Sequence, residues 1–273
     1  MTVELIIEAG KTERQYWKDL WHYRELFYKL TWRDVAVRYK QTAIGAAWAV
    51  LRPLLTMLAL TFVFGRIAEL PSDGKAPYAL MVFAATLPWQ LFASGLTSAS
   101  ESLVNNASLI SKVYFPRMLI PAATAGVAVV DFIISLIILA LIMLWYQFLP
   151  PLQILAVIPL TVLAGVLALG PGLILCALNV TYRDFRYIVP FITQFGIYIS
   201  PVGFSSSVVP DDLRLLFECN PMVGVIEGFR WAIIGAVDFP TRPILISAIF
   251  GLCLLVIGIV VFRKTENTFA DVI

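Results

Sequence analysis

The chain contains long stretches without a charged residue, and the longest of them constrains the fold most strongly. From Met118 to Tyr182 the only charged side chain is that of Asp131. A helix that crosses the hydrocarbon core of a bilayer needs roughly 20 mainly apolar residues, so this stretch is too long for a single crossing. The segment "FLPP" at 148–151 divides it, because proline ends helices and favours turns. The sequence therefore predicts two consecutive membrane spans here.

The composition of the whole chain agrees with a protein built for the bilayer. Of its 273 residues 60% are hydrophobic and 14% are charged, and the mean hydropathy is +0.85. Soluble domains are about 25% charged, which leaves this chain too little polar surface for a globule in water. We therefore predict an all-α polytopic membrane protein with six spans, at about 43–66, 77–102, 118–147, 152–178, 187–204 and 243–262.

The positions of lysine and arginine predict that both termini lie in the cytoplasm. With that orientation, eight of these residues fall in segment 1–42 and two in each of the other three cytoplasmic segments, whereas five fall in the outer segments. Cytoplasmic segments of membrane proteins carry such an excess. About 40 polar and amphipathic residues precede the first span, so no cleavable signal is expected. The predicted regions are a cytoplasmic part at 1–42, a transmembrane domain at 43–262 and a cytoplasmic tail at 263–273.

Segment 16–32 has the pattern of an amphipathic helix. Its apolar face is formed by Tyr16, Leu20, Tyr23, Phe27 and Leu30, and three tryptophans border that face. Tryptophan and tyrosine favour the headgroup region of a membrane, so we predict a helix that lies in the cytoplasmic interface. A soluble helix packed on a partner is the alternative.

Segment 211–236 is predicted to form two short helices on the outer side. Asn220 followed by Pro221 is a typical helix start, with asparagine at the N-cap and proline at the first helical position. Glu227 and Arg230 interrupt the apolar stretch that follows, and their spacing allows them to pair on one helix face. We expect a re-entrant segment that dips into the outer leaflet, with a plain extracellular helical hairpin as the alternative.

The residues show few signs of enzyme chemistry. The chain has no GxxxxGK[ST] phosphate loop and no cluster of cysteine and histidine, so neither ATP hydrolysis nor a metal site is expected. A net charge of +2 is too small to indicate nucleic-acid binding. Arg52 and Asp131 are the ionisable residues inside predicted spans, where such residues usually face a bundle interior or a cavity. For Asp131 structural pairing and a role in a substrate path stay open, and for Arg52 snorkelling to the membrane edge and lining of a cavity stay open.

Several large aromatic side chains lie close to polar residues in the predicted spans. Flat apolar rings beside polar groups suit sugars, and large aromatics also gate pores by excluding water. Many aromatics at span ends are explained by the interfacial belt alone. The candidate substrate path consists of Tyr39, Trp48, Trp89, Phe92, Gln194, Tyr198 and Phe204.

The connection "NNASLISKVYFPRMLIP" at 105–121 is more elaborate than a simple loop. Asn105 or Asn106 can cap a short helix that runs through Leu109 to Lys112, and Pro116 should end it. The apolar side chains in this connection are too numerous for a solvated loop. We expect them to press into a partner, with a helix resting on lipid headgroups as the alternative.

Five blocks of the sequence, at 38–54, 87–121, 179–188, 199–206 and 220–233, occur in an order that is familiar. They include "RYKQTAIGAAWAVLRPL" and "NPMVGVIEGFRWAI". Together they resemble the membrane subunit of bacterial polysaccharide ABC exporters, a type-2 permease family whose members export O-antigen, capsular polysaccharide or teichoic acid. Arg52 departs from the family pattern, because an apolar or small polar residue is expected there.

The resemblance implies a subunit of the bacterial inner membrane that exports lipid-linked polysaccharide. It implies a homodimer that binds two copies of a separate ATPase, which would hold the ATP and Mg²⁺, so this chain should need no cofactor. The alternatives are a type-2 exporter of a small drug or lipid and, less favoured, a transferase acting on polyprenyl lipids, which would need clustered acids. The first and fifth spans would line the channel, and the outer short helices would form part of its gate.

The resemblance also implies two sets of contact residues on the cytoplasmic side. Those expected to contact the ATPase are Asn106, Leu109, Ile110, Lys112, Tyr114, Phe115, Arg117, Arg183, Asp184 and Arg186. Those expected at lipid headgroups are Trp17, Trp21, Arg24, Lys29 and Arg33.

Overall fold

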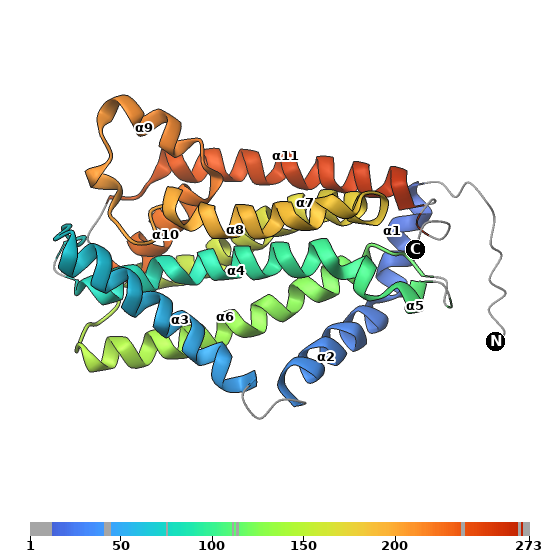
Figure 1. Cartoon of the computed structure of the whole chain (residues 1–273), viewed down its shortest axis with the longest axis horizontal. Coiled ribbons are helices and arrows are strands. Elements are labelled where there is room, and N and C mark those ends of the chain that lie inside the picture. Colours follow the sequence, from blue (N-terminus) through green and yellow to red (C-terminus); the bar gives the residue numbers. More distant parts are fainter. Residues whose placement is uncertain are drawn as a thin grey trace.

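The computed structural model is helical wherever it describes the chain, and no strand occurs in that part (Figure 1). It describes residues 13–40, 45–74, 76–110, 112, 115–235, 238–266 and 269. This confirms the all-α class that the apolar runs predict. The helices are α1 (Glu13–His22), α2 (Arg24–Lys40), α3 (Gly45–Leu60), η1 (Thr61–Ile67), α4 (Tyr78–Asn105), α5 (Ala107–Ile110), α6 (Leu119–Trp145), η2 (Leu152–Ala156), α7 (Val157–Thr181), η3 (Arg183–Tyr187), α8 (Ile188–Ile199), η4 (Ser206–Val208), α9 (Asp211–Glu218), α10 (Pro221–Ile234) and α11 (Thr241–Thr265).

Five helical segments in the described part of the chain are long and apolar enough to cross a membrane. They are 47–67, 78–105, 119–145, 152–181 and 241–265. The predicted span at 187–204 differs, because its helix α8 ends at Ile199 after 12 residues. At 1.5 Å per residue such a helix is roughly 18 Å long, which is shorter than the hydrocarbon core. The chain then continues through Ser200 with an extended backbone.

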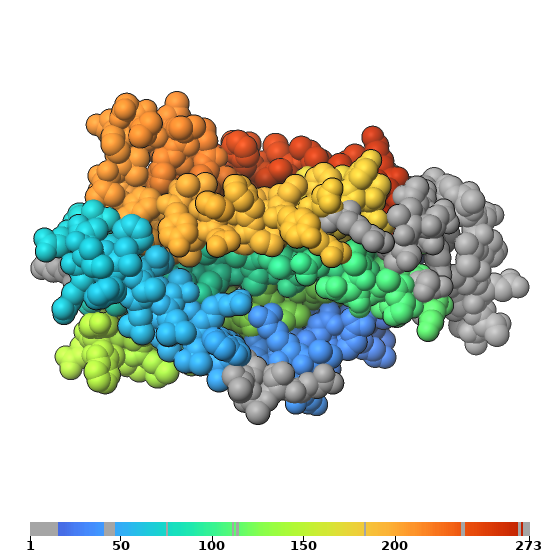
Figure 2. Space-filling model, in the orientation of Figure 1, coloured from blue at the N-terminus to red at the C-terminus, as the bar shows by residue number. Residues whose placement is uncertain are grey.

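Helix α4 forms the centre of the bundle. It packs against α6 on one side and α7 on the other, and α11 packs along α7 (Figure 1). Most of its side chains are buried, including Leu80, Phe83 and Leu96. Helices α3 and α8 lie at the surface on the face shown in Figure 2, with part of α4 visible between them. The central position of α4 means that polar residues on it face other helices.

The two ends of the bundle differ in character. Helices α9 and α10 and the segment η1 gather at one end, whereas α1, α5 and the last turn of α11 gather at the other (Figure 1). Asn220 caps α10 by accepting a hydrogen bond from the Met222 amide at 3.0 Å, which confirms the predicted helix start. Gly235 ends α10 with a left-handed backbone at φ 71°, a conformation that favours glycine.

The amphipathic N-terminal segment is divided into two helices that meet near Tyr23. The predicted apolar face points inward in part: Leu30 is buried, and Tyr16 and Leu20 pack against a cluster that includes Leu103 and Phe262. Trp17, Trp21 and Trp32 are exposed, at 50%, 73% and 59%. The indole rings of these three tryptophans are therefore accessible to a membrane surface or to another molecule.

Helices α7 and α11 approach closely at a glycine. A Cβ atom on Gly170 would lie 2.7 Å from the backbone nitrogen of Leu255 and 2.8 Å from the carbonyl carbon of Leu254. Because backbone atoms cannot move aside as a side chain can, this position requires the absence of a Cβ. Small residues allow such approach between membrane helices.

We expect Gly170→Ala to lower the free energy of unfolding by about 1–3 kcal/mol, as overpacking of a tight contact does. Gly165→Ala, in the same helix, is the matched control, because a Cβ there meets nothing within 4 Å. The control should be neutral or should stabilise by about 0.5–1 kcal/mol, since alanine favours helix over glycine. Thermal unfolding in one detergent measures both. Equal effects of the two substitutions would contradict the packing assignment.

Candidate functional site

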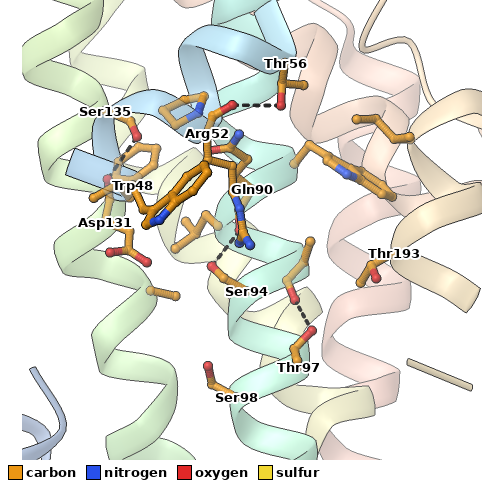
Figure 3. A pocket seen from close by; sticks show the side chains of 18 of the residues that line it. Trp48, Arg52, Thr56, Gln90, Ser94, Thr97, Ser98, Asp131, Ser135 and Thr193 are labelled. Carbon is orange, nitrogen blue, oxygen red and sulfur yellow. Dashed lines mark hydrogen bonds between the residues drawn. The ribbon is translucent and has the colours of Figure 1, made fainter. Parts of the chain in front are cut away.

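A polar pocket lies among the helices α3, α4, α6 and α8 (Figure 3). Its volume is about 510 Å³, within the range of small-molecule sites. The polar side chains on its wall are Arg38, Arg52, Thr56, Gln90, Ser94, Thr97, Ser98, Asp131, Ser135 and Thr193. Trp48, Trp89 and Phe132 add aromatic surface. The pocket therefore combines hydroxyl and amide groups with ring faces inside the region of the long apolar helices.

Asp131 of α6 is held by the end of α2. Its Oδ2 atom lies 2.8 Å from Nη2 of Arg38, and its Oδ1 atom accepts a hydrogen bond from the Tyr39 hydroxyl. Burial, followed by this bond to Asp131, raises the pKa of Tyr39, so the phenol stays protonated and donates. Of the two roles predicted for Asp131, pairing is thus observed, and Asp131 also lines the pocket.

The predicted path residues fall into three places. Trp48 and Trp89 line the pocket, the first 57% exposed on α3 and the second buried on α4 beside Phe92, with ring centroids 5.5 Å apart. Gln194 and Tyr198 lie exposed on α8. Phe204 lies outside the pocket, where its ring is 6.1 Å from that of Phe217. The structure brings only part of the predicted set together, and their role in a path stays a prediction.

A buried charged network ties the outer segments together. Arg230 of α10 is 1% exposed, and its Nη1 atom lies 3.5 Å from Oδ2 of Asp73, which is 7% exposed. Asp73 also accepts a hydrogen bond from the Ser205 hydroxyl, and Tyr78 donates to the carbonyl of Gly203 at 2.6 Å. Helical spacing allows Arg230 to pair with Glu227 on the same helix, whereas in the structure its ion pair is with Asp73, in the connection between η1 and α4.

The connection at 105–121 is built differently from its prediction. Within the described residues, the short helix α5 covers only the four residues Ala107–Ile110 and ends before Lys112. The Asn106 amide donates to the carbonyl of Ser102 at 2.9 Å, and its Oδ1 atom accepts from Arg33 of α2 at 2.7 Å. A candidate for headgroup contact and a candidate for ATPase contact therefore bond to each other.

The candidate ATPase-contact residues differ in exposure. Ile110 and Phe115 are buried in this chain, at 7% and 4%, so they cannot offer an open apolar surface in this conformation. Lys112 is exposed, as are Asp184 and Arg186 in η3. Tyr114 and the side chain of Arg183 lie outside the described part of the chain. Contact of this set with a partner stays a prediction.

Glu266 joins three segments at the same end of the bundle. Its Oε1 atom accepts from the Arg117 amide at 2.9 Å and from the Tyr16 hydroxyl at 3.4 Å, and its carbonyl accepts from the Arg117 guanidinium. The Arg263 guanidinium stacks on the Tyr16 ring at 3.6 Å. Burial raises the pKa of the Glu266 carboxyl, and the hydrogen bonds from Arg117 and Tyr16 oppose that shift.

Several residues of these sites were not predicted from the sequence, although the polar residues of α4 show a pattern that indicates some of them. Gln90, Ser94, Thr97 and Ser98 follow helical spacing on α4 and form a polar stripe in an otherwise apolar span. That stripe marks the face of α4 that borders the pocket. Asp73 and Glu266 carry no comparable local signal, because their partners are far away in the sequence.

Long apolar helices around an interior polar pocket define an integral membrane protein that crosses the bilayer several times. The comparison with known proteins then gives the family. The model of the ABC-2 type transporter family matches residues 25–234, and the chain belongs to that family.

The chain is also similar to named transport proteins over most of its length. It is 27% identical to the O-antigen export system permease protein RfbA of Klebsiella pneumoniae, over 91% of this chain and 95% of the relative. It is 25% identical to the protein of that name from Myxococcus xanthus, over 93% and 97%. It is 26% identical to the capsule polysaccharide export inner-membrane protein CtrC of Neisseria meningitidis, over 74% and 76%.

Proposed function

We propose that this chain is the channel-forming subunit of an ATP-driven exporter that moves lipid-linked polysaccharide out of the cytoplasm across the bacterial inner membrane. The observation that carries the proposal is the similarity to O-antigen and capsule export permeases over most of their length and of this chain. The pocket of hydroxyl, amide and ring surfaces is compatible with a sugar chain, whose hydroxyls cannot enter hydrocarbon without a cost of several kcal/mol each. The alternative, an exporter of small drugs or lipids, has no support among these relatives.

The proposed topology has six spans and cytoplasmic termini. The fifth span would combine α8 with the extended residues up to about 204, and α9 and α10 would re-enter from the outer side. The shared location of α1 and the end of α11 supports placement of both on one side of the membrane. Helices α1 and α2 would lie in the cytoplasmic interface, where Trp17, Trp21, Arg24 and Lys29 are exposed.

The active assembly is proposed to contain two copies of this chain and two copies of a separate ATPase subunit. The ATPase would bind ATP and Mg²⁺, and this chain would carry no cofactor. Helices α3 and α8 expose apolar rows on the face beside the pocket, including Leu55 and Leu58 on α3 and Phe191 and Phe195 on α8. A second copy related by a two-fold axis would close a path that one bundle leaves open.

Loss of the gene tests the proposed function directly. The expected result is the disappearance of one surface glycan together with accumulation of its lipid-linked form inside the cell. Restoration by the intact gene completes the test. An unchanged surface glycan, with drug sensitivity altered instead, would replace the proposal with the alternative.

We expect Lys112→Glu to weaken association with the ATPase subunit about twofold to fivefold, the usual effect of one exposed charge at an interface. Lys112 is chosen because it is exposed, so the reversal leaves the buried residues of the connection in place. Lys264→Glu is the matched control, an exposed lysine near the end of α11. Copurification of the complex over a salt series measures the effect. Equal binding by both variants would remove the 105–117 connection from the interface.

A further inference from the structure

Arg52 presents an uncompensated positive charge to the pocket. Within the described part of the chain its guanidinium has neither an ion pair nor a hydrogen bond, although it lies on the pocket wall. The other charged groups on that wall are Arg38 and Asp131, which pair with each other at 2.8 Å. The two arginines and one aspartate of the described pocket wall therefore give it a net charge of one positive unit.

Two polar side chains of α4 on the pocket wall donate to no protein group in the described structure. In the described structure the side-chain amide of Gln90 and the hydroxyl of Ser98 bond to no other protein group. Ser94 and Thr97 differ, because their hydroxyls donate to the carbonyls of Gln90 and Ala93 at 2.7 and 2.8 Å (Figure 3). Among the arginine, amide and hydroxyl groups of the described wall, the free donors thus belong to Arg52 on α3 and to Gln90 and Ser98 on α4. Gln90 and Ser98 are eight residues apart, roughly 12 Å along the helix axis, so one small ligand can meet only one of them together with Arg52.

This arrangement fits an anionic oxygen ligand. Arg52 is an exposed residue within a predicted span, and charged residues in spans usually face a bundle interior or a water-filled cavity and mark a pathway. A guanidinium can donate two parallel hydrogen bonds to phosphate oxygens, and a neighbouring amide can donate to a further oxygen of the same group. Phosphate esters are the anions that a bilayer supplies in quantity, as the headgroups of its lipids.

We propose that Arg52, with Gln90, binds the phosphate ester of a lipid headgroup in this pocket. The identity of that lipid as the anchor of the exported glycan rests on the proposed function, whereas the phosphate chemistry rests on the pocket alone. The aromatic surface of Trp48 borders the same pocket and would contact the sugar or prenyl part next to the phosphate. In this proposal Arg52 binds a ligand in the pocket, whereas the alternative, snorkelling to the membrane edge, involves no ligand.

Lipid binding to the purified full chain in detergent, measured by native mass spectrometry, tests the site. The probes are geranylgeranyl diphosphate, the uncharged geranylgeraniol, phosphatidylglycerol and inorganic diphosphate. We expect Arg52→Gln to weaken the diphosphate lipid about tenfold, which equals about 1.4 kcal/mol. Arg52→Lys should keep part of the affinity, because lysine keeps the charge but loses the bidentate geometry. Gln90→Leu is a second variant that leaves the arginine in place.

Arg66→Gln is the matched control. Arg66 is an exposed arginine of η1, which directly follows α3, and it lies outside the pocket wall. It should bind every probe as the unmodified chain does. If phosphatidylglycerol binding depends on Arg52 to the same extent, the phosphate site is supported and its ligand is bulk phospholipid. If only inorganic diphosphate binding depends on Arg52, the ligand is a free anion. Selective dependence for the prenyl diphosphate would assign it to a lipid carrier.

Binding that is unchanged in Arg52→Gln, or equally tight binding of geranylgeraniol, would overturn the phosphate site. Arg52-dependent binding of glucuronate with none of the diphosphate lipid would also overturn it and assign the charge to an acidic sugar. These outcomes are separate from the test of the proposed function. A chain whose deletion leaves every surface glycan intact could still bind phosphate through Arg52, and a glycan exporter could lack this site.

Discussion

Replacement of Arg230 with methionine is expected to destabilise the folded chain by about 3–5 kcal/mol. The guanidinium is 1% exposed and pairs with Asp73, which is itself buried. Methionine fills much of the volume of arginine but removes the ion pair of the Asp73 carboxylate, whose remaining hydrogen bond within the described residues comes from the Ser205 hydroxyl. An unpaired buried charge costs far more than the loss of the pair itself. Thermal unfolding in detergent, followed by size-exclusion chromatography, measures the effect.

Two further variants separate charge from packing. Asp73→Asn combined with Arg230→Met should recover most of the lost stability, because no isolated charge then remains. Arg66→Met is the control on an exposed arginine that has no ion pair in the described part of the chain, and it should change the free energy of unfolding by no more than about 0.5 kcal/mol. If the double variant is as unstable as Arg230→Met alone, the ion pair is not the cause.

Replacement of Trp89 with alanine is expected to cost about 3–5 kcal/mol of stability, as large-to-small changes of buried aromatics do. Trp89 is 4% exposed, contacts the ring of Phe92 and fills the space beside Gly196 of α8. Its loss would leave a cavity between α4 and α8. Without this side chain the distance between α4 and α8 would no longer be held constant. We therefore expect export to decrease together with the stability of the chain.

Tyr198→Ala is the matched comparison within the predicted path. Its side chain is 63% exposed on α8, so the free energy of unfolding should change by about 0.5 kcal/mol or less. If Tyr198 lines the path, export should fall while the melting temperature stays the same. Unchanged export in cells that carry Tyr198→Ala would remove this residue from the path, and an unchanged melting temperature for Trp89→Ala would show that Trp89 does not brace α8.

The apolar runs were sufficient to locate the long helices, because the length of an uncharged stretch directly limits what can lie in a bilayer. They were less informative for α8, which ends at Ile199 although the uncharged run continues. The predicted span continued through Ser200 and Pro201 to residue 204, because apolar composition does not distinguish a helix from an extended segment within one run. The start of α10 at Asn220 was predictable because capping is a local property.

The partners of charged residues were the part that the sequence could not supply. Local spacing favoured a bond between Glu227 and Arg230, but Arg230 instead pairs with Asp73 across the fold. Asp131 was recognisable as an unusual residue in a span, whereas its partner Arg38 depends on how α2 packs against α6. Such pairs follow from the packing of distant helices, which no spacing rule contains.

The bonds of Glu266 have a consequence for how motion would travel through the molecule. Arg117 precedes α6, Tyr16 belongs to α1, and Glu266 follows α11, so one carboxylate and its neighbouring carbonyl connect the ends of three helices. A displacement that reaches Arg117 cannot shift the start of α6 alone while these bonds hold. These bonds pass it on to the ends of α1 and α11, so the three helix ends respond together.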